Sequence, residues 1–456
     1  MCGIAGIIAL NSDKRISAVE RSELAGMLSL INNRGPDGFG FWSDSYSNVL
    51  FGHVRLSIID LALGKQPMVD TNSNLAITFN GEIYNFLELK KTYLTSYPFK
   101  TNSDTEVILA LYDKFGEDFP KYLRGMFALA IYDGKKNKVI LARDHIGKKP
   151  LFYFKSNDHI YFSSEYKSFL EVQAFKPEMD LESVHYFLNL RWVPGNRCLL
   201  KSLQQVSPGE ILIIENGKEK LKKYWTLNPT TGQSELFNQK SLLEGLDHYI
   251  DQAVKRRLIA DVPVGLFLSG GLDSSAILHY AKKKSNANIS TFTFGFNQPN
   301  DELVEAKETA DYYHSDHTEM VITESPFQFF SEAIWHCETP KVNSVQVYLL
   351  SKYASKKIKV VLSGLGGDEL FGGYDNYLFA KVLNPFVSLP FKSIGNTLRN
   401  ISYTFFTKSF DFKKDELRRG AELVLSFGNK ANFYSVLRNV WDVNSSVYSD
   451  INIMRT

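Results

Sequence analysis

The chain has 456 residues, of which 44% are hydrophobic and 22% are charged, and this composition excludes disordered, collagen-like and coiled-coil proteins. Its length predicts about two or three domains. The 52 basic and 50 acidic side chains leave a formal charge of only +2, and no apolar run approaches the roughly 20 residues of a membrane span. We therefore expect neither nucleic acid nor a membrane as a partner.

The cysteines are Cys2, Cys198 and Cys337, which are too few for a disulfide framework and match no zinc-binding spacing. The opening segment MCGIAGIIAL has no charged stretch ahead of its apolar run, so it does not resemble a secretory signal. These features predict a reducing, cytoplasmic location. We expect Cys198 and Cys337 to be inert core residues.

Cys2 follows the initiator methionine, and removal of Met1 would leave it with both a thiol and a free α-amino group. An α-amine titrates near pH ~8 and a thiol near pH ~8.5, so the amine can accept the thiol proton without a catalytic histidine. Cys2 is therefore a candidate N-terminal nucleophile. Taken alone, the pattern is weak evidence for catalysis, because most lone cysteines are inert small core residues.

Short apolar stretches, which predict strands, alternate with polar clusters through the first part of the chain. The expected strands are residues 4–9, 49–53, 75–79, 127–132 and 139–142. The polar clusters are Arg34-Gly35-Pro36-Asp37-Gly38, residues 52–60, residues 79–85, Ser103-Asp104-Thr105-Glu106 and residues 142–151. Each cluster alone is compatible with a turn or a helix cap.

In this order after Cys2, the clusters resemble the class II glutamine amidotransferase domain, an N-terminal-nucleophile hydrolase with an α+β sandwich of two sheets between helices (αββα). The resemblance implies that Cys2 attacks the side-chain amide of glutamine and that glutamate and ammonia are released. It also implies a glutamine site formed by Arg55, Leu56, Ser57, Ile58, Ile59, Asn80, Gly81, Glu82 and Asp104.

The charges in this set give the site its expected selectivity. Arg55 would pair with the α-carboxylate of glutamine, and Asp104, with Glu82 nearby, would hold the α-ammonium. Asn80 and the Gly81 N–H would donate to the oxyanion of the tetrahedral intermediate.

Two motifs in this part of the chain have a structural alternative. Asn-Gly is a strong signal for a tight hairpin turn, which is the other interpretation of Asn80-Gly81. Arg34 and Asp37 could equally form an internal salt bridge that shapes a loop near Cys2, and no catalytic role is assigned to them.

The pattern changes after Pro208. We predict an amidotransferase domain over residues 2–215, a linker over 216–240 and a second domain over 241–456, because residues 228–241 are rich in Thr, Gly, Gln and Ser. Residues 242–258 have helical spacing, and residues 262–268 form an apolar run typical of a buried parallel strand. Further strands are expected at 289–294 and 360–362, with a helix at 306–312. This alternation predicts an α/β doubly wound parallel sheet.

The strand at 262–268 leads into Ser269-Gly270-Gly271-Leu272-Asp273-Ser274-Ser275, which is neither a Walker A loop nor a dinucleotide-binding fingerprint. A glycine-rich turn between a strand and a helix presents N–H groups to an anion. The motif resembles the pyrophosphate loop of enzymes that cleave ATP between its α and β phosphates. The resemblance implies ATP contacts from Leu268, Ser269, Gly270, Gly271, Asp273, Ser274, Ser275, Phe294, Ser363, Gly364 and Asp368.

Together, the two domains resemble the glutamine-hydrolysing asparagine synthetases. This implies that ATP adenylates the aspartate side chain, that pyrophosphate leaves, and that ammonia from the first domain attacks the adenylate. Asp273 and Asp368, each after a strand, would hold Mg²⁺ on the pyrophosphate. Glutamine, aspartate or another carboxylate, and ATP are the expected small-molecule partners, and a homodimer is possible within this family.

Two features depart from the family pattern. Leu365 stands where the family usually has an acidic residue, and the chain after Tyr374 is shorter than the resemblance leads us to expect. The alternative function is amidation of a different carboxylate, for example in surface polysaccharide or natural-product assembly. A regulatory protein that binds glutamine or ATP without turnover is a third hypothesis, which the presence of Cys2, Asn80, Asp273 and Asp368 together disfavours.

Overall fold

The computed structural model describes residues 1–11, 15–228, 238–284, 289–296, 301–323, 325–375, 377–378 and 381. The chain divides into two compact units, Met1–Glu178 with Gly195–Gly364, and Met179–Pro194 with Leu365–Thr456. The centre of the predicted linker, at 229–237, and the whole of the predicted second domain after 381 lie outside the described residues. Within the described residues, no helix combines the length and the apolar character needed to span a membrane.

The first sheet has six strands in the order β10-β8-β9-β1-β3-β2. Its strands are β1 (Gly3–Ala9), β2 (Gly38–Ser43), β3 (Val49–Arg55), β8 (Phe152–Lys155), β9 (His159–Ser163) and β10 (Leu203–Gln205). The central strand β1 pairs antiparallel with both β3 and β9. A side chain at Gly6 would come within 2.3 Å of the Phe162 ring on β9, so this close approach requires glycine.

The second sheet also has six strands, in the order β12-β11-β7-β6-β5-β4. They are β4 (Met68–Asp70), β5 (Leu75–Ile83), β6 (Gly125–Asp133), β7 (Lys138–Arg143), β11 (Glu210–Glu215) and β12 (Lys218–Lys223). Strand β12 falls within the predicted linker and pairs antiparallel with β11 over its whole length. The domain limits given above stay a prediction.

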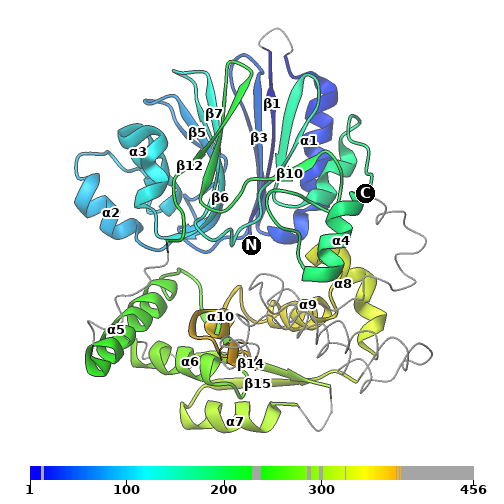
Figure 1. The fold of residues 1–456 in the computed structure, drawn as a ribbon. Helices are drawn as coiled ribbons and strands as arrows, with labels where there is room; N and C mark the ends of the chain where they lie inside the picture. The colour runs from blue at the N-terminus through cyan, green and yellow to red at the C-terminus, as the bar shows by residue number, and fades with distance from the viewer. Residues whose placement is uncertain are drawn as a thin grey trace, which may run out of the picture. The chain divides into compact units, whose positions relative to one another are not determined.

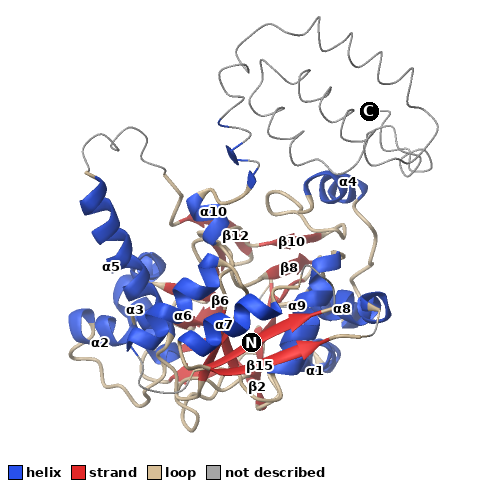
Figure 2. Ribbon diagram, turned by 90° about the horizontal axis from the view of Figure 1, so that it is seen from below, coloured by secondary structure: helices blue, strands red, loops and turns tan. Residues whose placement is uncertain are grey.

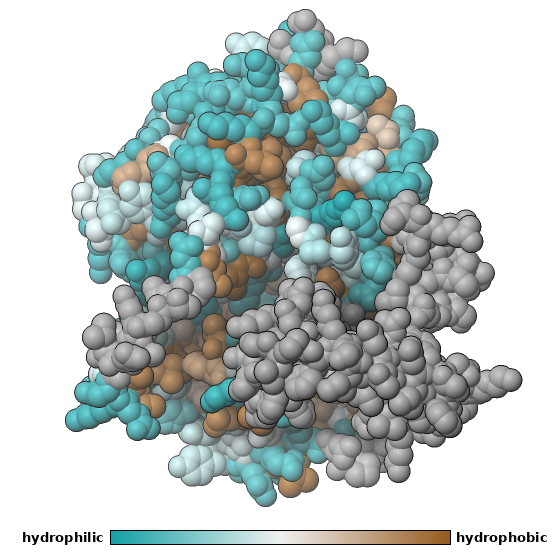
Figure 3. All heavy atoms as spheres, viewed as in Figure 1, coloured by the Kyte–Doolittle hydropathy of each residue, from teal (hydrophilic) through white to brown (hydrophobic). Residues whose placement is uncertain are grey.

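The two sheets form a four-layer αββα sandwich, as expected from the sequence. Figure 1 shows α1 (Ala18–Leu30) beside the first sheet, and α2 (Phe86–Tyr93) and α3 (Asp104–Phe115) beside the second. Side chains alternate between the two faces of each strand, so a strand can supply two cores. On β5, Ala76 belongs to the core between the sheets, and Ile77 belongs to the core under α2 and α3. Hydrophilic residues cover most of the sandwich face that is visible in Figure 3.

The third sheet has four strands in the order β15-β14-β13-β16, all parallel. They are β13 (Val264–Phe267), β14 (Ser290–Gly295), β15 (Asp316–Val321) and β16 (Val360–Leu362). Its helices are α5 (Gln239–Arg257), α6 (Leu272–Lys284), α7 (Leu303–Tyr312), α8 (Phe330–Cys337) and α9 (Val342–Ala354). Figure 2 shows α7 next to β15.

Helices cover both faces of this sheet, which confirms the predicted doubly wound fold. Val254, Leu278 and Ala306, from α5, α6 and α7, share one core with the sheet. Leu350 and Ala354 of α9 share another core with Phe292 of β14. Because β14 and β16 flank β13 on opposite sides, the strand order reverses at β13 and β16, and such a switch point creates a crevice at the carboxyl ends of the strands.

The second unit contributes α4 (Leu181–Leu190) and α10 (Gly367–Phe371). Helix α10 begins after Gly366 and ends before Gly372, both of which have positive φ values, 108° and 69°. These left-handed residues limit α10 to a short helix. Short 3₁₀ helices occur in the larger unit at η1 (Asn32–Arg34), η2 (Gly116–Tyr122), η3 (Tyr166–Glu171) and η5 (Pro326–Phe329).

The sandwich core gives a stability prediction. Leu129 of β6 is 0% exposed in the core under α2 and α3, so Leu129→Ala leaves a cavity and should lower the free energy of unfolding by about 2–5 kcal/mol. Leu87→Ala on α2, where the side chain is 49% exposed, is the matched control and should change it by less than about 0.5 kcal/mol. Urea denaturation followed by circular dichroism measures both. Equal effects of the two substitutions would contradict the assignment of this core.

Candidate active sites

Cys2 lies just before the first residue of β1, where the sheet pairing brings it to the end of β3. The Leu56 N–H donates to Cys2 Sγ at 3.3 Å, and the thiol approaches the Leu56 carbonyl at 3.5 Å. Burial raises the pKa of the Cys2 thiol, and the bond from Leu56 partly offsets this effect. The thiol is thus half-buried and held on two sides by backbone atoms of the predicted glutamine site.

Asn80 and Gly81 lie inside β5 and pair with Ala128 and Phe127 of β6, so the hairpin-turn alternative is wrong. Asn80 shares its strand face with Thr78, whose Oγ1 donates to the Gly52 carbonyl of β3 at 3.2 Å. The Asn80 side chain therefore faces the sheet that carries Cys2. It is 1% exposed, and its Nδ2 has no hydrogen-bond partner in the described part of the chain. A buried, unpaired donor costs free energy, and it indicates that a bound molecule supplies the acceptor.

Glu82 and Asp104 form an acidic pair beside this strand. Asp104, at the start of α3, is 4% exposed and accepts the Ile83 N–H through Oδ2 at 2.9 Å. Burial raises the pKa of Asp104 to about 6, and both burial and the Asp104 charge raise that of Glu82. Glu82 in turn raises the pKa of Cys2, so the acidic pair acts on the thiol. Such a pair can accept one ammonium group.

Arg55 ends β3, and its guanidinium donates to the Asp60 carbonyl at 2.7 Å and to the Leu61 carbonyl at 3.1 Å. Both partners are neutral, and no carboxylate pairs with Arg55 in the regions that the structure describes. The loop that follows contains Leu56, Ser57, Ile58 and Ile59, all partly buried. Arg55 therefore makes no ion pair among the described residues, although its charge acts on Asp37. A guanidinium in this state can pair with a carboxylate.

The expected salt bridge between Arg34 and Asp37 is wrong. Arg34 donates through Nε to the Cys2 carbonyl at 2.9 Å, and its Nη1 pairs with Glu165 at 2.7 Å. Asp37 instead pairs with Lys359 at 2.7 Å and accepts the Ser57 N–H. Sequence reasoning missed Glu165, because ion pairs between distant segments leave no local pattern. It also assigned no role to Lys149, which is 4% exposed although it lies in one of the recognised clusters.

The predicted pyrophosphate loop connects β13 to α6 and is held by its own serines. Ser274 Oγ accepts the Ser269 N–H at 3.1 Å, and Ser269 Oγ accepts the Gly271 N–H at 3.2 Å. The Gly270 N–H donates to the carboxylate of Glu302 at 3.2 Å. An anionic oxygen therefore already lies against the loop, and this contact fits a loop that binds phosphate oxygens.

The other predicted ATP residues of the larger unit gather at the same sheet edge. Leu268 follows β13, Phe294 lies near the end of β14, and Ser363-Gly364 follow β16, so all stand at carboxyl ends of parallel strands. A Cβ on Gly364 would come within 2.8 Å of the Ser274 nitrogen, so the two loops pack directly at the switch point. This is the place where open α/β sheets bind ligands.

The predicted Mg²⁺ ligands are Asp273 in the first turn of α6 and, in the second unit, Asp368 in the first turn of α10. Both are partly buried. No group of three or more His, Cys, Asp or Glu side chains that could hold a metal ion occurs among the described residues. Carboxylate oxygens are the protein ligands that Mg²⁺ prefers, so the donor type fits.

Comparisons with known proteins match both halves of the chain. The glutamine amidotransferase domain family matches residues 1–225, and the asparagine synthase family matches residues 245–432. The putative asparagine synthetase [glutamine-hydrolyzing] 2 of Methanocaldococcus jannaschii is 35% identical, over 83% of this chain and 76% of its own length. The chain belongs to the glutamine-hydrolysing asparagine synthetase family.

Other members of the family are longer. Asparagine synthetase [glutamine-hydrolyzing] 1 of Bacillus subtilis is 37% identical over 86% of this chain, which spans 61% of that relative's length. Amidase chry2 of Gibberella zeae is 33% identical, over 86% of this chain and 62% of its own length.

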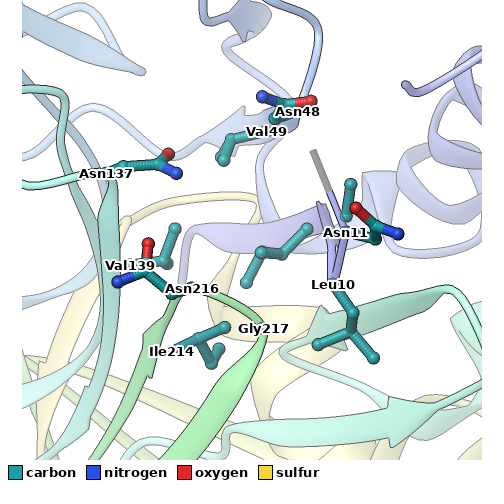
Figure 4. A pocket seen from close by; sticks show the side chains of 11 residues that line it. Leu10, Asn11, Asn48, Val49, Asn137, Val139, Ile214, Asn216 and Gly217 are labelled. Atoms are coloured by element: carbon teal, nitrogen blue, oxygen red, sulfur yellow. The ribbon is translucent and has the colours of Figure 1, made fainter. Parts of the chain in front are cut away.

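A separate pocket lies where β1 ends, at the opposite end of that strand from Cys2. As Figure 4 shows, Leu10, Val49, Val139 and Ile214 line it, together with the carboxamides of Asn11, Asn48, Asn137 and Asn216. None of the predicted site residues lines this pocket. The candidate active sites are therefore distinct from it.

The unpaired amide of Asn80 gives the first prediction for this site. Asn80→Ala removes an oxyanion donor and should lower kcat for glutamine hydrolysis by about 10²–10³-fold with little change in KM, because the donor acts on charge that develops in the transition state. A coupled glutamate assay measures both constants. Because Nδ2 makes no hydrogen bond, the melting temperature should stay close to that of the parent. A rate loss below about fivefold would contradict the role.

The acidic pair gives a second prediction, on pH. Both carboxylates have raised pKa values, and that of Asp104 is about 6, so Asp104 is ionised above this pH and becomes protonated as the pH falls through it. The KM for glutamine should therefore rise as the pH is lowered from 7.5 to 5.5. Steady-state kinetics across this range test it, with Asp104→Asn as the comparison. A flat KM profile in the parent protein would contradict the assignment.

Proposed function

We propose that this protein is a glutamine-dependent asparagine synthetase, with a glutaminase site at Cys2 and an ATP site at the carboxyl edge of the parallel sheet. The observation that carries the proposal is the buried amide of Asn80, whose Nδ2 lacks a partner and whose side chain faces the sheet that ends in Cys2. The developing oxyanion of a glutamine amide under attack by a thiol is the acceptor that such a donor suits.

In the glutaminase step, Cys2 Sγ attacks the side-chain amide carbon and the α-amine takes the thiol proton. The carbonyl oxygen gains negative charge near Asn80 Nδ2 and the Gly81 N–H. When the tetrahedral intermediate collapses, the C–N bond breaks, the amine returns its proton to the leaving group, and ammonia departs. Water then cleaves the γ-glutamyl thioester and releases glutamate. Arg55 and the Glu82–Asp104 pair would hold the α-carboxylate and the α-ammonium.

In the synthetase step, the loop from Ser269 to Ser275 and the N-terminus of α6 hold the phosphates of ATP. The aspartate side-chain carboxylate attacks the α phosphorus and pyrophosphate leaves, which gives an acyl group that ammonia can attack. Asp273 and Asp368 would hold Mg²⁺, which supplies positive charge to the leaving pyrophosphate. The assignment of the phosphate-binding loop is supported by the Glu302 carboxylate oxygen, which already accepts the Gly270 N–H.

The acceptor is part of the proposal, since the chain spans 61% of the length of the Bacillus subtilis relative. Leu365 is 83% exposed and cannot transfer a proton to or from ammonia. A homodimer also belongs to the proposal, and the near-zero net charge of +2 supports small molecules rather than nucleic acid as partners. A reducing compartment suits the chemistry because Cys2 must stay a thiol.

The test is ATP-dependent pyrophosphate release by the purified protein with Mg²⁺ and glutamine, with and without aspartate, with asparagine and glutamate measured in the same samples. We expect pyrophosphate and asparagine to form in equal amounts only when aspartate is present. Cys2→Ala is the matched control: it should abolish glutamate release and leave synthesis from added ammonium chloride intact.

The outcomes separate the two sites. Glutamate release without aspartate-dependent pyrophosphate would support the glutaminase assignment and overturn aspartate as the acceptor. No glutamate release by the parent protein would overturn the glutaminase assignment itself. Pyrophosphate formation from ammonium chloride in that case would still support the ATP site.

A further inference from the structure

Lys149 is a buried cation beside the proposed nucleophile, and the glutaminase step described above does not use it. The residue is 4% exposed, and its ammonium donates to the Met1 sulfur at 2.8 Å. Among the described residues, this sulfur is its only hydrogen-bond partner, and thioether sulfur is a weak acceptor. Removal of Met1 would take away even this partner, because the sulfur belongs to the residue directly before Cys2.

The loop ahead of Lys149 fixes this inward position. Asp144 is 1% exposed, and its carboxylate accepts four backbone N–H groups, from Phe127, Ile146, Lys148 and Lys149, at 2.9 to 3.2 Å. Arg143 Nε donates to the Lys149 carbonyl at 2.8 Å. The backbone of Lys149 is therefore held on both sides, while its neighbour Lys148 is exposed.

Lys149 shares its surroundings with several charged groups, which also act on Cys2 or on the amino terminus. They are Arg34 and Glu82, together with the Cys2 thiol, whereas Glu165 acts on the amino group and Lys148 acts on Lys149 alone. Burial, with help from Arg34, lowers the pKa of Lys149 to about 8, so it stays mostly protonated at neutral pH. Burial lowers the pKa of the Met1 amino group to about 5, and Arg34 and Lys149 act in the same direction. Once Met1 is removed, the α-amine is the Cys2 nitrogen, one residue further along the chain and next to the thiol on which Lys149 also acts.

We propose that Lys149 is a positioning residue of the glutaminase site: its fixed positive charge keeps the neighbouring α-amine neutral and stabilises the Cys2 thiolate. The proposal rests on the glutaminase role of Cys2. A protonated amine cannot accept the thiol proton, so a nearby cation that opposes its protonation keeps the base available. The same cation favours the thiolate over the thiol, and the thiolate is the nucleophile.

The first test measures the thiol directly and needs no glutaminase activity. Iodoacetamide alkylation of Cys2 is followed by peptide mass spectrometry between pH 5.5 and 9.5 in the parent and in Lys149→Met, Lys149→Arg and Lys148→Met. In Lys149→Met we expect the midpoint of the rate profile to move up by about one pH unit. Lys149→Arg keeps the charge and Lys148→Met changes an exposed neighbour, so both should keep the parent midpoint.

The second test separates this effect from that of the acidic pair. The acidic limb of kcat at saturating glutamine reports the base in the enzyme–substrate complex, whereas KM also reports the carboxylates that bind substrate. Lys149→Met should shift the limb of kcat to higher pH. Because Lys149 also lowers the pKa of Glu82, the pH profile of KM should move in the same direction, so the limb of kcat is the readout for the base. Methionine has nearly the length of lysine without its charge, and replacing a buried charge by an apolar group is tolerated, so the variant should fold.

An unchanged alkylation midpoint in Lys149→Met would overturn the proposal, as would an equal shift in Lys149→Arg or Lys148→Met. The proposal is supported if the midpoint shifts in Lys149→Met and stays at the parent value in Lys149→Arg and Lys148→Met. Failure of the glutaminase assignment would show differently, as a parent protein that releases no glutamate. If Lys149→Met does not fold, as judged by circular dichroism, Lys149→Gln replaces it in the same comparison.

Discussion

Antiparallel pairing of β1 with β3 and β9 is the constraint on which the rest of the site depends. It puts the first strand in the middle of the sheet, so the residue ahead of Gly3 meets the end of β3 and the backbone of Leu56. The interior face of β5 then places Asn80 opposite this sheet. The sandwich thus holds Cys2, the residue beside the amino terminus, among rigid strands.

Buried charge is the second organising feature. The glutaminase region contains Arg34, Glu82, Asp104, Lys149 and Glu165, all in places where water is largely excluded. Ionisation in such surroundings depends on neighbours more than on solvent, so each group changes the proton affinity of the next. The parallel sheet differs, since its proposed anion-binding loop presents neutral N–H groups at a strand end and a helix start.

The sequence predicted β1, β3, β5, β6 and β7 of the sandwich and β13, β14 and β16 of the parallel sheet from their apolar stretches, but not β2, β4, β8, β9, β10 or β15. It predicted both folds through the family resemblance of motifs that stand at strand ends. The prediction was less accurate where contacts between distant segments determine the local structure. The strong turn tendency of Asn80-Gly81 yields to pairing with β6, and Arg34 finds Glu165, which is 131 residues away along the chain, rather than nearby Asp37. The sequence also does not predict that Lys149, within a polar cluster, is buried. Its burial follows from the hydrogen bonds of Asp144.

The position of Cys2 against the first strand has a practical meaning for any longer version of this polypeptide. The fold can tolerate a residue ahead of Cys2, because Met1 is 55% exposed and disturbs no strand. The proposed chemistry cannot, since any peptide bond to the Cys2 nitrogen converts the proposed base into an amide. On this proposal, affinity tags belong elsewhere, and a preparation in which initiator-methionine removal is incomplete is a mixture of folded molecules with and without glutaminase activity.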